Sequence, residues 1–253
     1  MFEPENELEE SLIKASTDPA HRPQFYKDLA ESDIFIIQHG EVPEQAGKKT
    51  LAPGMQLKIQ NIEIDGKLYI PVFSSISRIQ AVIDTEVGYL AFNALEFFEI
   101  VNGSELILNP GSEYGKEFTR NEVASIVNGT IWEPEHTYEV ENETTVLIGQ
   151  PKNYPHELAE ALTAYFKTQQ EVLSAYLAHF YNPATGDPPH TLVGILATEN
   201  WNEIIASAGI IAKEVEIADP PVDFVRVDTE GGNLDYFHEI EPFYQKKNSG
   251  LFQ

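Results

Sequence analysis

Hydrophobic positions in the first half of the chain follow helical spacing in some segments and strand-like spacing in others. Leu8, Leu12 and Ile13, an apolar stripe at i, i+4 and i+5, predict an amphipathic helix over residues 5–17, and the next stripe predicts a second helix over 22–31. Further apolar stripes predict helices near residues 76–83, 93–101 and 119–127. Short apolar runs between them predict strands at residues 34–37, 55–64, 67–73, 88–92 and 104–108.

Turn and cap residues mark where several of these elements begin and end. Asp18-Pro19 ends the first helix, because the residue before a proline avoids the helical region. Asp65-Gly66 predicts a tight hairpin turn. Thr119 followed by Glu122 predicts a helix N-cap with a capping box. Residues 39–54 are rich in glycine and proline, so they predict a loop.

The second half gives a clearer pattern. Its apolar runs predict strands at 138–148, 171–180, 190–198 and 222–227. Helical stripes predict helices at 156–167, 201–213 and 233–246. The resulting order is βαββαβ plus a terminal helix, which is typical of the ferredoxin-like fold, with a mostly antiparallel sheet and helices on one face.

These patterns together predict an α+β protein of two domains, covering residues 1–130 and 131–253. Each domain is expected to hold a mixed or mostly antiparallel sheet with helices packed on it. Residues 128–136, around Trp132 and Pro134, are expected to join the two domains.

Charge narrows the classes of partner. The 253-residue chain has a formal net charge of −25. Residues 1–130 hold 21 acidic and 10 basic side chains (net −11), and residues 131–253 hold 20 and 6 (net −14). Both halves repel polyanions, so nucleic acids and anionic membranes are disfavoured as partners. The acidity either keeps the surface well solvated or forms a face for a basic protein partner.

Composition also narrows the chemistry and the compartment. The chain has no cysteine, which excludes disulfides, thiolate zinc sites and a cysteine nucleophile. No run of about 18 apolar residues predicts a membrane span. The acidic first residues lack the basic and apolar regions of a secretory signal. We therefore expect a cytoplasmic protein.

The sequence carries no recognisable catalytic centre. Gly111–Glu117 resembles a phosphate-binding loop, but the spacing of its glycines is one residue short, and a Glu stands where Ser or Thr would hold magnesium. It is better interpreted as a tight loop. The seven histidines lack metal-ligand spacing; the best cluster is His136 with Glu135 and Glu139, where a surface histidine is the simpler interpretation. No nucleophile elbow is present. We expect no cofactor, no metal and no catalytic residues.

Two segments place aromatic residues beside basic ones in an otherwise acidic chain. Arg22 and Phe25 lie near one end, and Phe243 and Tyr244 lie near the other, just before two lysines. One interpretation is helix packing with a cation stacked on a ring. The other is a partner-binding surface, where aromatic and arginine anchors concentrate.

Several segments, taken together and in order, resemble the SseB (enhanced serine sensitivity) family of bacterial proteins. The matching residues are Asn6–Leu12 with Ala15, Pro19–Phe25, Ile70–Ser75, Leu106–Phe118 (LILNPGSEYGKEF) and Pro242–Tyr244. The resemblance implies an SseB-like N-terminal domain followed by the family's own C-terminal domain. It implies no catalytic residues and no settled reaction.

Two functional hypotheses follow. The first is a non-catalytic binding or regulatory protein with a protein partner. The alternative is a small-metabolite-binding protein or enzyme that acts near serine or sulfur metabolism. The family name is the ground for this choice of metabolism. The ligand contact of such a protein would be the loop 109–117, because loops after strands often carry function. The candidate residues of this loop are Asn109, Gly111, Ser112, Tyr114 and Lys116. The oligomeric state stays open.

Overall fold

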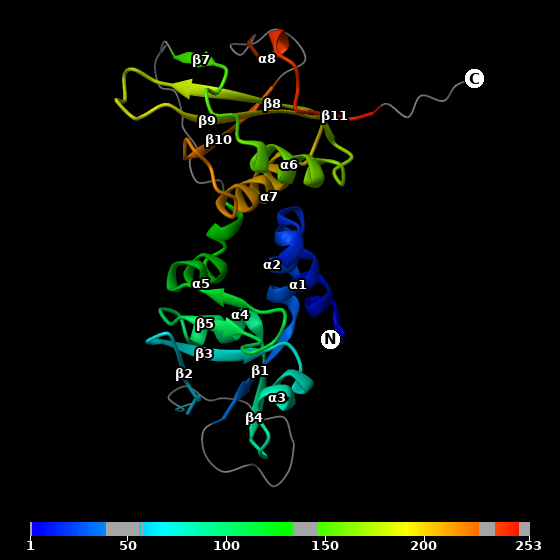
Figure 1. Ribbon diagram of the computed structural model, residues 1–253, viewed down its shortest axis with the longest axis vertical. Coiled ribbons are helices and arrows are strands. Elements are labelled where there is room, and N and C mark those ends of the chain that lie inside the picture. The colour runs from blue at the N-terminus through cyan, green and yellow to red at the C-terminus, as the bar shows by residue number, and fades with distance from the viewer. Residues whose placement is uncertain (1, 39–55, 57, 134–145, 228–235, 248–253) are drawn as a thin grey trace, which may run out of the picture. The chain divides into compact units, whose positions relative to one another are not determined.

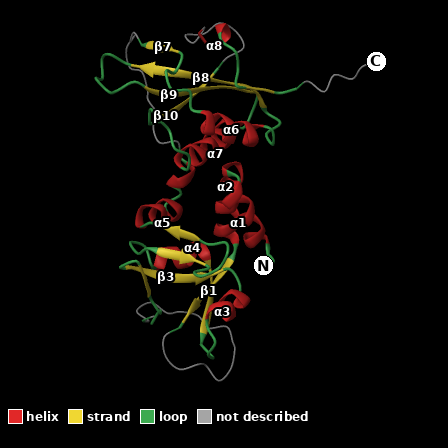
Figure 2. Cartoon of the chain, viewed as in Figure 1, coloured by secondary structure: helices red, strands yellow, loops and turns green. Residues whose placement is uncertain are grey.

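The computed structural model describes residues 2–38, 56, 58–133, 146–227 and 236–247 of the chain (Figure 1). The chain divides into two compact units. Unit 1 comprises Met1–Thr17 and Gln24–Ile131, and unit 2 comprises Asp18–Pro23 and Trp132–Gln253. Both units mix helices and strands, as expected for an α+β protein (Figure 2).

Unit 1 is built on a mixed six-stranded sheet. Its strands are β1 (Asp33–Ile37), β2 (Ile62–Ile64), β3 (Lys67–Phe73), β4 (Tyr89–Asn93), β5 (Leu106–Leu108) and β6 (Lys116–Phe118). The order across the sheet is β4-β1-β3-β5-β6, and β2 also pairs with β3. Only β3 and β5 run parallel; the other pairs are antiparallel.

Helices cover both faces of this sheet. They are α1 (Glu7–Thr17), α2 (Arg22–Glu31), α3 (Ile76–Val82), α4 (Ala94–Ile100) and α5 (Arg120–Val127). Ile79 of α3 packs against Ile37 and Phe73. Ile34 and Ile36 alternate with Phe35 and Ile37 along β1, so they point to the opposite face. The main core of unit 1 is therefore separate from the α3 side, and its buried residues include Leu8, Leu12, Phe25, Leu29, Phe97, Phe98, Phe118 and Val123.

Several local signals act as the sequence predicts. Asp65 and Gly66 both have positive φ (50° and 79°), the backbone of a tight hairpin turn between β2 and β3. The Thr119 side chain accepts a hydrogen bond from the Glu122 backbone N–H and so caps α5. The strand predicted at 55–64 is shorter, since β2 begins at Ile62. The loop predicted at 39–54 lies outside the described residues. Strand β6 was missed, because three residues give too short a pattern.

Unit 2 holds a five-stranded sheet. Its elements are β7 (Leu147–Gly149), α6 (His156–Phe166), β8 (Val172–Tyr181), β9 (His190–Ala197), α7 (Trp201–Lys213), β10 (Val222–Arg226), α8 (Tyr236–Glu239) and β11 (Tyr244–Gln245). The order is β10-β9-β8-β11, and β7 also pairs with β8. The short 3-10 helix Pro19–His21 belongs to this unit as well, and Ala20 packs against its core.

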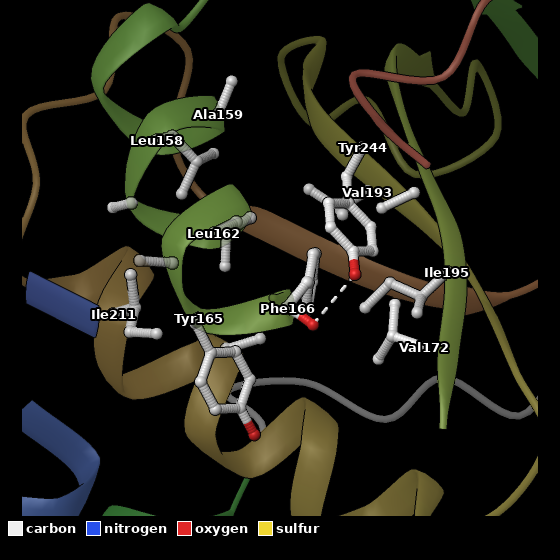
Figure 3. Close-up of a cluster of buried hydrophobic side chains, with 14 of the residues drawn as sticks. Leu158, Ala159, Leu162, Tyr165, Phe166, Val172, Val193, Ile195, Ile211 and Tyr244 are labelled. Atoms are coloured by element: carbon white, nitrogen blue, oxygen red, sulfur yellow. Dashed lines mark hydrogen bonds between the residues drawn. The ribbon is translucent and has the colours of Figure 1, made fainter. Parts of the chain in front are cut away.

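The unit 2 sheet is packed on both faces, so the expectation of helices on one face only is wrong. Leu162 and Phe166 of α6 and Ile211 of α7 form one core with alternate strand residues such as Val193 (Figure 3). Phe237 of α8 forms the other core with the intervening strand residues, including Ala178 and Leu192.

The ferredoxin-like detail is not confirmed. β10 lies beside β9 and parallel to it, and β7 and β11 both pair with β8. The predicted terminal helix 233–246 is also wrong where the structure describes it. α8 spans only Tyr236–Glu239, and Phe243 N–H donates to the Ala175 carbonyl at the edge of β8. Pro242 explains the break, because it disfavours helical backbone at Glu241 and has no N–H to continue the helix.

Within the described residues, no helix is both long enough and apolar enough to cross a membrane.

Two glycines of unit 2 give opposite predictions for the same substitution. A Cβ added at Gly194 would lie 2.8 Å from the buried Phe237 ring, closer than atoms pack. Gly194→Ala should therefore lower the free energy of unfolding of unit 2 by about 1–3 kcal/mol. Gly209 lies in α7, where an added Cβ meets nothing within 4 Å. Gly209→Ala should raise stability by about 0.5–1 kcal/mol. Urea denaturation followed by circular dichroism measures both; an unchanged midpoint for Gly194→Ala contradicts the packing of α8.

Candidate functional site

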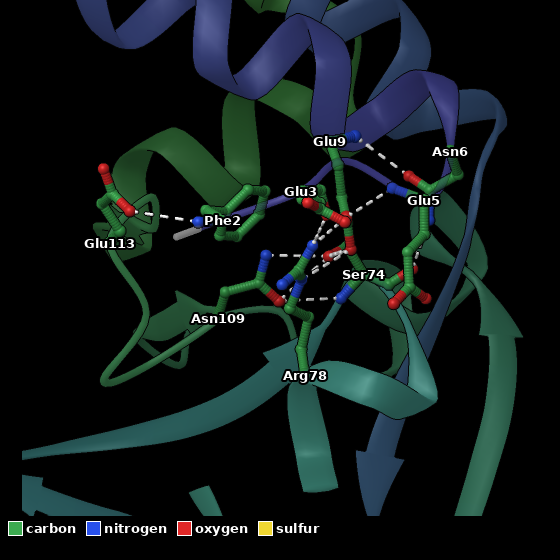
Figure 4. Close-up of polar contacts among 9 residues, drawn as sticks. All are labelled: Phe2, Glu3, Glu5, Asn6, Glu9, Ser74, Arg78, Asn109 and Glu113. Carbon is green, nitrogen blue, oxygen red and sulfur yellow. Dashed lines mark hydrogen bonds and ion pairs between the residues drawn. The ribbon is translucent and has the colours of Figure 1, made fainter. Parts of the chain in front are cut away.

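The loop 109–117 lies against the segment Phe2–Glu9 in unit 1 (Figure 4). Asn109 stands at the start of the loop with φ of +51°, a left-handed conformation that asparagine tolerates better than most residues. Its side chain is 1% exposed. Asn109 Oδ1 accepts from the Ser74 N–H at 2.9 Å, and its Nδ2 donates to Ser74 Oγ at 2.8 Å. Asn109 therefore ties the loop to the chain after β3.

Ser74 connects this loop to a buried carboxylate on α1. Ser74 Oγ donates to Glu9 Oε1 at 2.6 Å. The Glu9 residue is 0% exposed. Arg78 of α3 donates to both Glu9 oxygens, from Nε at 3.0 Å and from Nη2 at 2.5 Å. The Glu5 N–H adds a further donor at 2.9 Å. We call Glu9, Ser74, Arg78 and Asn109 the Glu9–Arg78 cluster.

The electrostatics of the cluster keep Glu9 ionised. Burial alone would raise the pKa of the Glu9 carboxyl, but hydrogen bonds from Arg78, Ser74 and the Glu5 N–H, with the charge of Arg78, outweigh it. The pKa of Glu9 therefore lies below its ordinary value. The same hydrogen bonds from Arg78 to Glu9 raise the pKa of Arg78.

Further contacts hold the first residues of the chain to the cluster and to the loop 109–117. The Arg78 guanidinium lies over the Phe2 ring, 3.6 Å from its centroid, and donates to the Glu3 carbonyl. The Phe2 N–H donates to Glu113 Oε2 at 3.2 Å, and the Phe2 ring meets Tyr114 edge-on at 5.2 Å between centroids. Two side chains of the loop, Glu113 and Tyr114, thus hold Phe2.

The glycines of the loop allow backbone conformations and close approaches that other residues would not. Gly111 has φ of +77°, which favours glycine. A Cβ at Gly115 would lie 2.7 Å from the Leu108 carbonyl oxygen, so no other residue fits this turn without a shift of the backbone. Lys116 lies in β6, where its ammonium pairs with the Glu122 carboxylate at 2.9 Å. These roles match the interpretation of Gly111–Glu117 as a tight loop.

The structure brings together some predicted site residues and separates others. Asn109 and Tyr114 lie around the segment Phe2–Glu9; Ser112 and Tyr114 are half-buried. Arg22, Phe243 and Tyr244 belong to unit 2. Arg22 Nη1 donates to the Glu214 carbonyl at 2.9 Å and lies 3.5 Å from its carboxylate.

Two aromatic candidates are not surface anchors, which corrects that interpretation in favour of packing. Phe25 is 1% exposed, in the core of unit 1. Tyr244 is 7% exposed, and its hydroxyl donates to the Phe166 carbonyl at 3.1 Å. Burial raises the pKa of Tyr244. Phe243 is half-buried and packs against the same core. Burying these rings removes apolar surface from water, so it stabilises the units rather than a complex.

Unit 2 contains a cavity that sequence analysis missed. Its volume is about 400 Å³, and it lies between the end of α7, the following loop and β10. Polar and apolar atoms contribute about equally to its surface, and Lys213 is the charged residue among the lining residues Gly209, Ala212, Lys213, Val215, Ile217, Pro220, Pro221, Val222 and Phe224.

No metal centre is visible in the described part of the chain, where no three histidine or carboxylate side chains converge. The cluster of His136 with Glu135 and Glu139, for which a surface histidine was the simpler interpretation, lies outside the described residues. His190 Nε2 lies 2.8 Å from Asp223 Oδ2, and its Nδ1 lies 3.3 Å from the Pro188 carbonyl oxygen. This histidine therefore links β9 to β10.

Comparisons with known proteins agree along the whole chain. A family model described as the SseB protein N-terminal domain matches residues 8–125, and one described as the SseB protein C-terminal domain matches residues 140–246. Proteins named Protein SseB from Escherichia coli (strain K12) and from Shigella flexneri are each 30% identical over 258 residues. These alignments cover 100% of this chain and 97% of each relative. No solved structure matches the chain.

The Glu9–Arg78 cluster predicts a specific acid sensitivity. Since the pKa of Glu9 is lowered in the folded state, its ion pair contributes full stability above the unfolded value of about 4.5 and loses it as pH falls through the folded pKa. Glu9→Gln should cost about 3–5 kcal/mol near neutral pH, because it leaves Arg78 without its counter-charge. As pH falls below about 4.5, Glu9→Gln should also lose less of its stability than the wild type loses, because it has no carboxylate at this position to protonate.

Exposed Glu10 on the same helix provides the matched control. Glu10→Gln should change the free energy of unfolding by less than about 0.5 kcal/mol. Urea denaturation between neutral and acidic pH compares the variants. A Glu9→Gln curve that follows the wild-type curve at every pH contradicts the assigned ionisation.

Asn109 allows its hydrogen bonds to be separated from its backbone conformation. Asn109→Ala should lose both the bonds to Ser74 and the tolerance of positive φ, whereas Asn109→Gly should lose only the bonds. We expect Asn109→Ala to be the less stable variant by about 1 kcal/mol, the cost of left-handed backbone for a residue with a Cβ. Thermal denaturation provides the measurement, and equal stability of the two variants contradicts this account.

Proposed function

The chain belongs to the SseB family, and from this premise we propose that it is a non-catalytic cytosolic protein that binds a basic protein partner. One observation carries the proposal: the net charge of −25 is shared by both halves of the chain, −11 and −14, on two well-packed units. A field of one sign steers oppositely charged proteins and speeds their association.

Side chains of the loop 109–117 are engaged in contacts within unit 1, so we expect a partner to bind another surface. Asn109 is buried on Ser74, Lys116 pairs with Glu122, and Glu113 and Tyr114 hold Phe2. These side chains organise unit 1 itself. They therefore favour the non-catalytic proposal over a metabolite site in this loop, although Ser112 and Tyr114 are only half-buried and a ligand could still reach them.

Affinity capture at graded salt tests the proposal. The full chain, immobilised, should retain a basic protein from a lysate of its own organism at low ionic strength and release it as salt rises, because salt screens the exposed charges. A polyglutamate of matched net charge, −25, serves as the control for charge without a fold.

Retention of the same protein in equal amount by polyglutamate contradicts a specific partner. Retention of no protein above background contradicts the proposed function itself.

A further inference from the structure

The cavity of unit 2 lies at an edge of the sheet. Among the described residues, β10 pairs with β9 alone and so forms one border of the sheet. Such a border presents backbone N–H and C=O groups to its surroundings, which allows another strand to add to the sheet. A partner could therefore recognise β10 through the backbone groups of its outer edge as well as through its side chains.

The register shows which groups of β10 face outward. The Val227 N–H donates to the Ile195 carbonyl of β9 at 2.9 Å. Because the N–H and C=O of one residue point to the same side and successive residues alternate, Val225 and Asp223 also face β9. Val222, Phe224 and Arg226 then direct their backbone groups away from β9.

The same strand walls the cavity. The cavity is lined by Val222 and Phe224, and Phe224 is half-buried. An incoming strand that bonds to their backbone groups would place its own side chains on the same face, beside the cavity. A volume of about 400 Å³ falls within the range of ligand pockets. An edge open to backbone pairing and a pocket with apolar side chains on its wall therefore coincide.

We propose that the outer edge of β10 is the docking site for an extended, basic segment of a partner protein. The segment adds to the sheet as a strand and inserts an apolar side chain into the cavity between α7 and β10. This inference rests on the proposed function and names its surface.

Charge favours a basic heterologous segment over a second copy of this chain. The stretch from Lys213 to Pro221 beside the cavity holds one basic residue and three acidic ones, Glu214, Glu216 and Asp219. Glu214 already pairs with Arg22, and the Asp219 carboxylate lies 3.7 Å from His179 Nε2. A lysine flanking the apolar anchor would therefore meet the exposed Glu216. A second copy would instead bring its own net charge of −25 to the same edge.

A defined peptide tests the proposal with the full chain. The probe is an acetylated and amidated heptapeptide of sequence KVKLKVK, labelled for fluorescence anisotropy. Its matched control carries backbone N-methyl groups on alternate residues, which remove hydrogen-bond donors and keep charge and side chains. The account predicts saturable binding of the probe and at least tenfold weaker binding of the methylated peptide.

Variants of β10 locate the site. Arg226→Pro removes an outward N–H without removing a bond to β9, as proline does on edge strands. Arg226→Ala removes the same charge and keeps the N–H. The probe should bind Arg226→Pro at least tenfold more weakly than Arg226→Ala. Gly209→Leu, which fills the cavity, should weaken binding relative to Gly209→Ala.

The following outcomes would overturn the proposed site or the proposed function. Equal affinity of the two peptides, or of the two Arg226 variants with matching melting curves, overturns strand addition at β10 and indicates attraction by charge alone. Probe-induced dimerisation of the chain in sedimentation also overturns it. A partner captured equally by wild type and Arg226→Pro leaves the proposed function standing and rules out this site. A partner captured by neither protein rules out the proposed function as well.

Discussion

Glu9 places a carboxylate in the interior of unit 1, and the surrounding structure is arranged to satisfy it. An unpaired charge at zero exposure would destabilise the fold severely. Arg78 supplies two donors and the counter-charge, and Ser74 supplies a third donor. Ser74 is in turn fixed by Asn109 at the start of the loop 109–117. Helix α1, helix α3 and the loop are therefore held by one connected set of hydrogen bonds.

This constraint changes how the most distinctive segment of the sequence is understood. The run from Asn109 to Lys116 has the glycines and polar residues of a ligand loop. In the structure its glycines meet backbone requirements, and Asn109, Glu113 and Tyr114 hold the chain's own residues. Unit 2 combines different features, a cavity partly lined by apolar side chains and the border strand β10, which suit recognition of another chain. The two units thus differ in role. In unit 1 the side chains of the loop 109–117 bond to residues of the same unit, and unit 2 carries the proposed binding surface.

Local patterns predicted most of the fold, and long-range partners explain what they missed. Helices such as α2 and α7 follow their apolar stripes, and Asp65-Gly66 and Thr119 act as local signals. The pairing of Glu9 with Arg78 joins residues 69 positions apart, so no local pattern reveals it. A weak signal was present, because Arg78 is the single basic residue between Lys67 and Lys116 and sits within an apolar helical stripe.

The errors near Pro242 have the same origin. The predicted helix over residues 233–246 ran past Pro242, but Phe243 and Tyr244 take their partners from β8 and α6. Sheet order also depends on contacts that no single segment encodes, which is why the βαββαβ order did not give the observed arrangement around β8 and β9.

The central claim is that binding belongs to the β10 edge of unit 2 and that the loop 109–117 organises unit 1. Amide hydrogen exchange of the full chain, with and without its captured partner, tests this division most directly. The account predicts slowed exchange at Val222–Arg226 on binding and unchanged exchange at residues 109–117. Slowed exchange in the loop with β10 unchanged would contradict it.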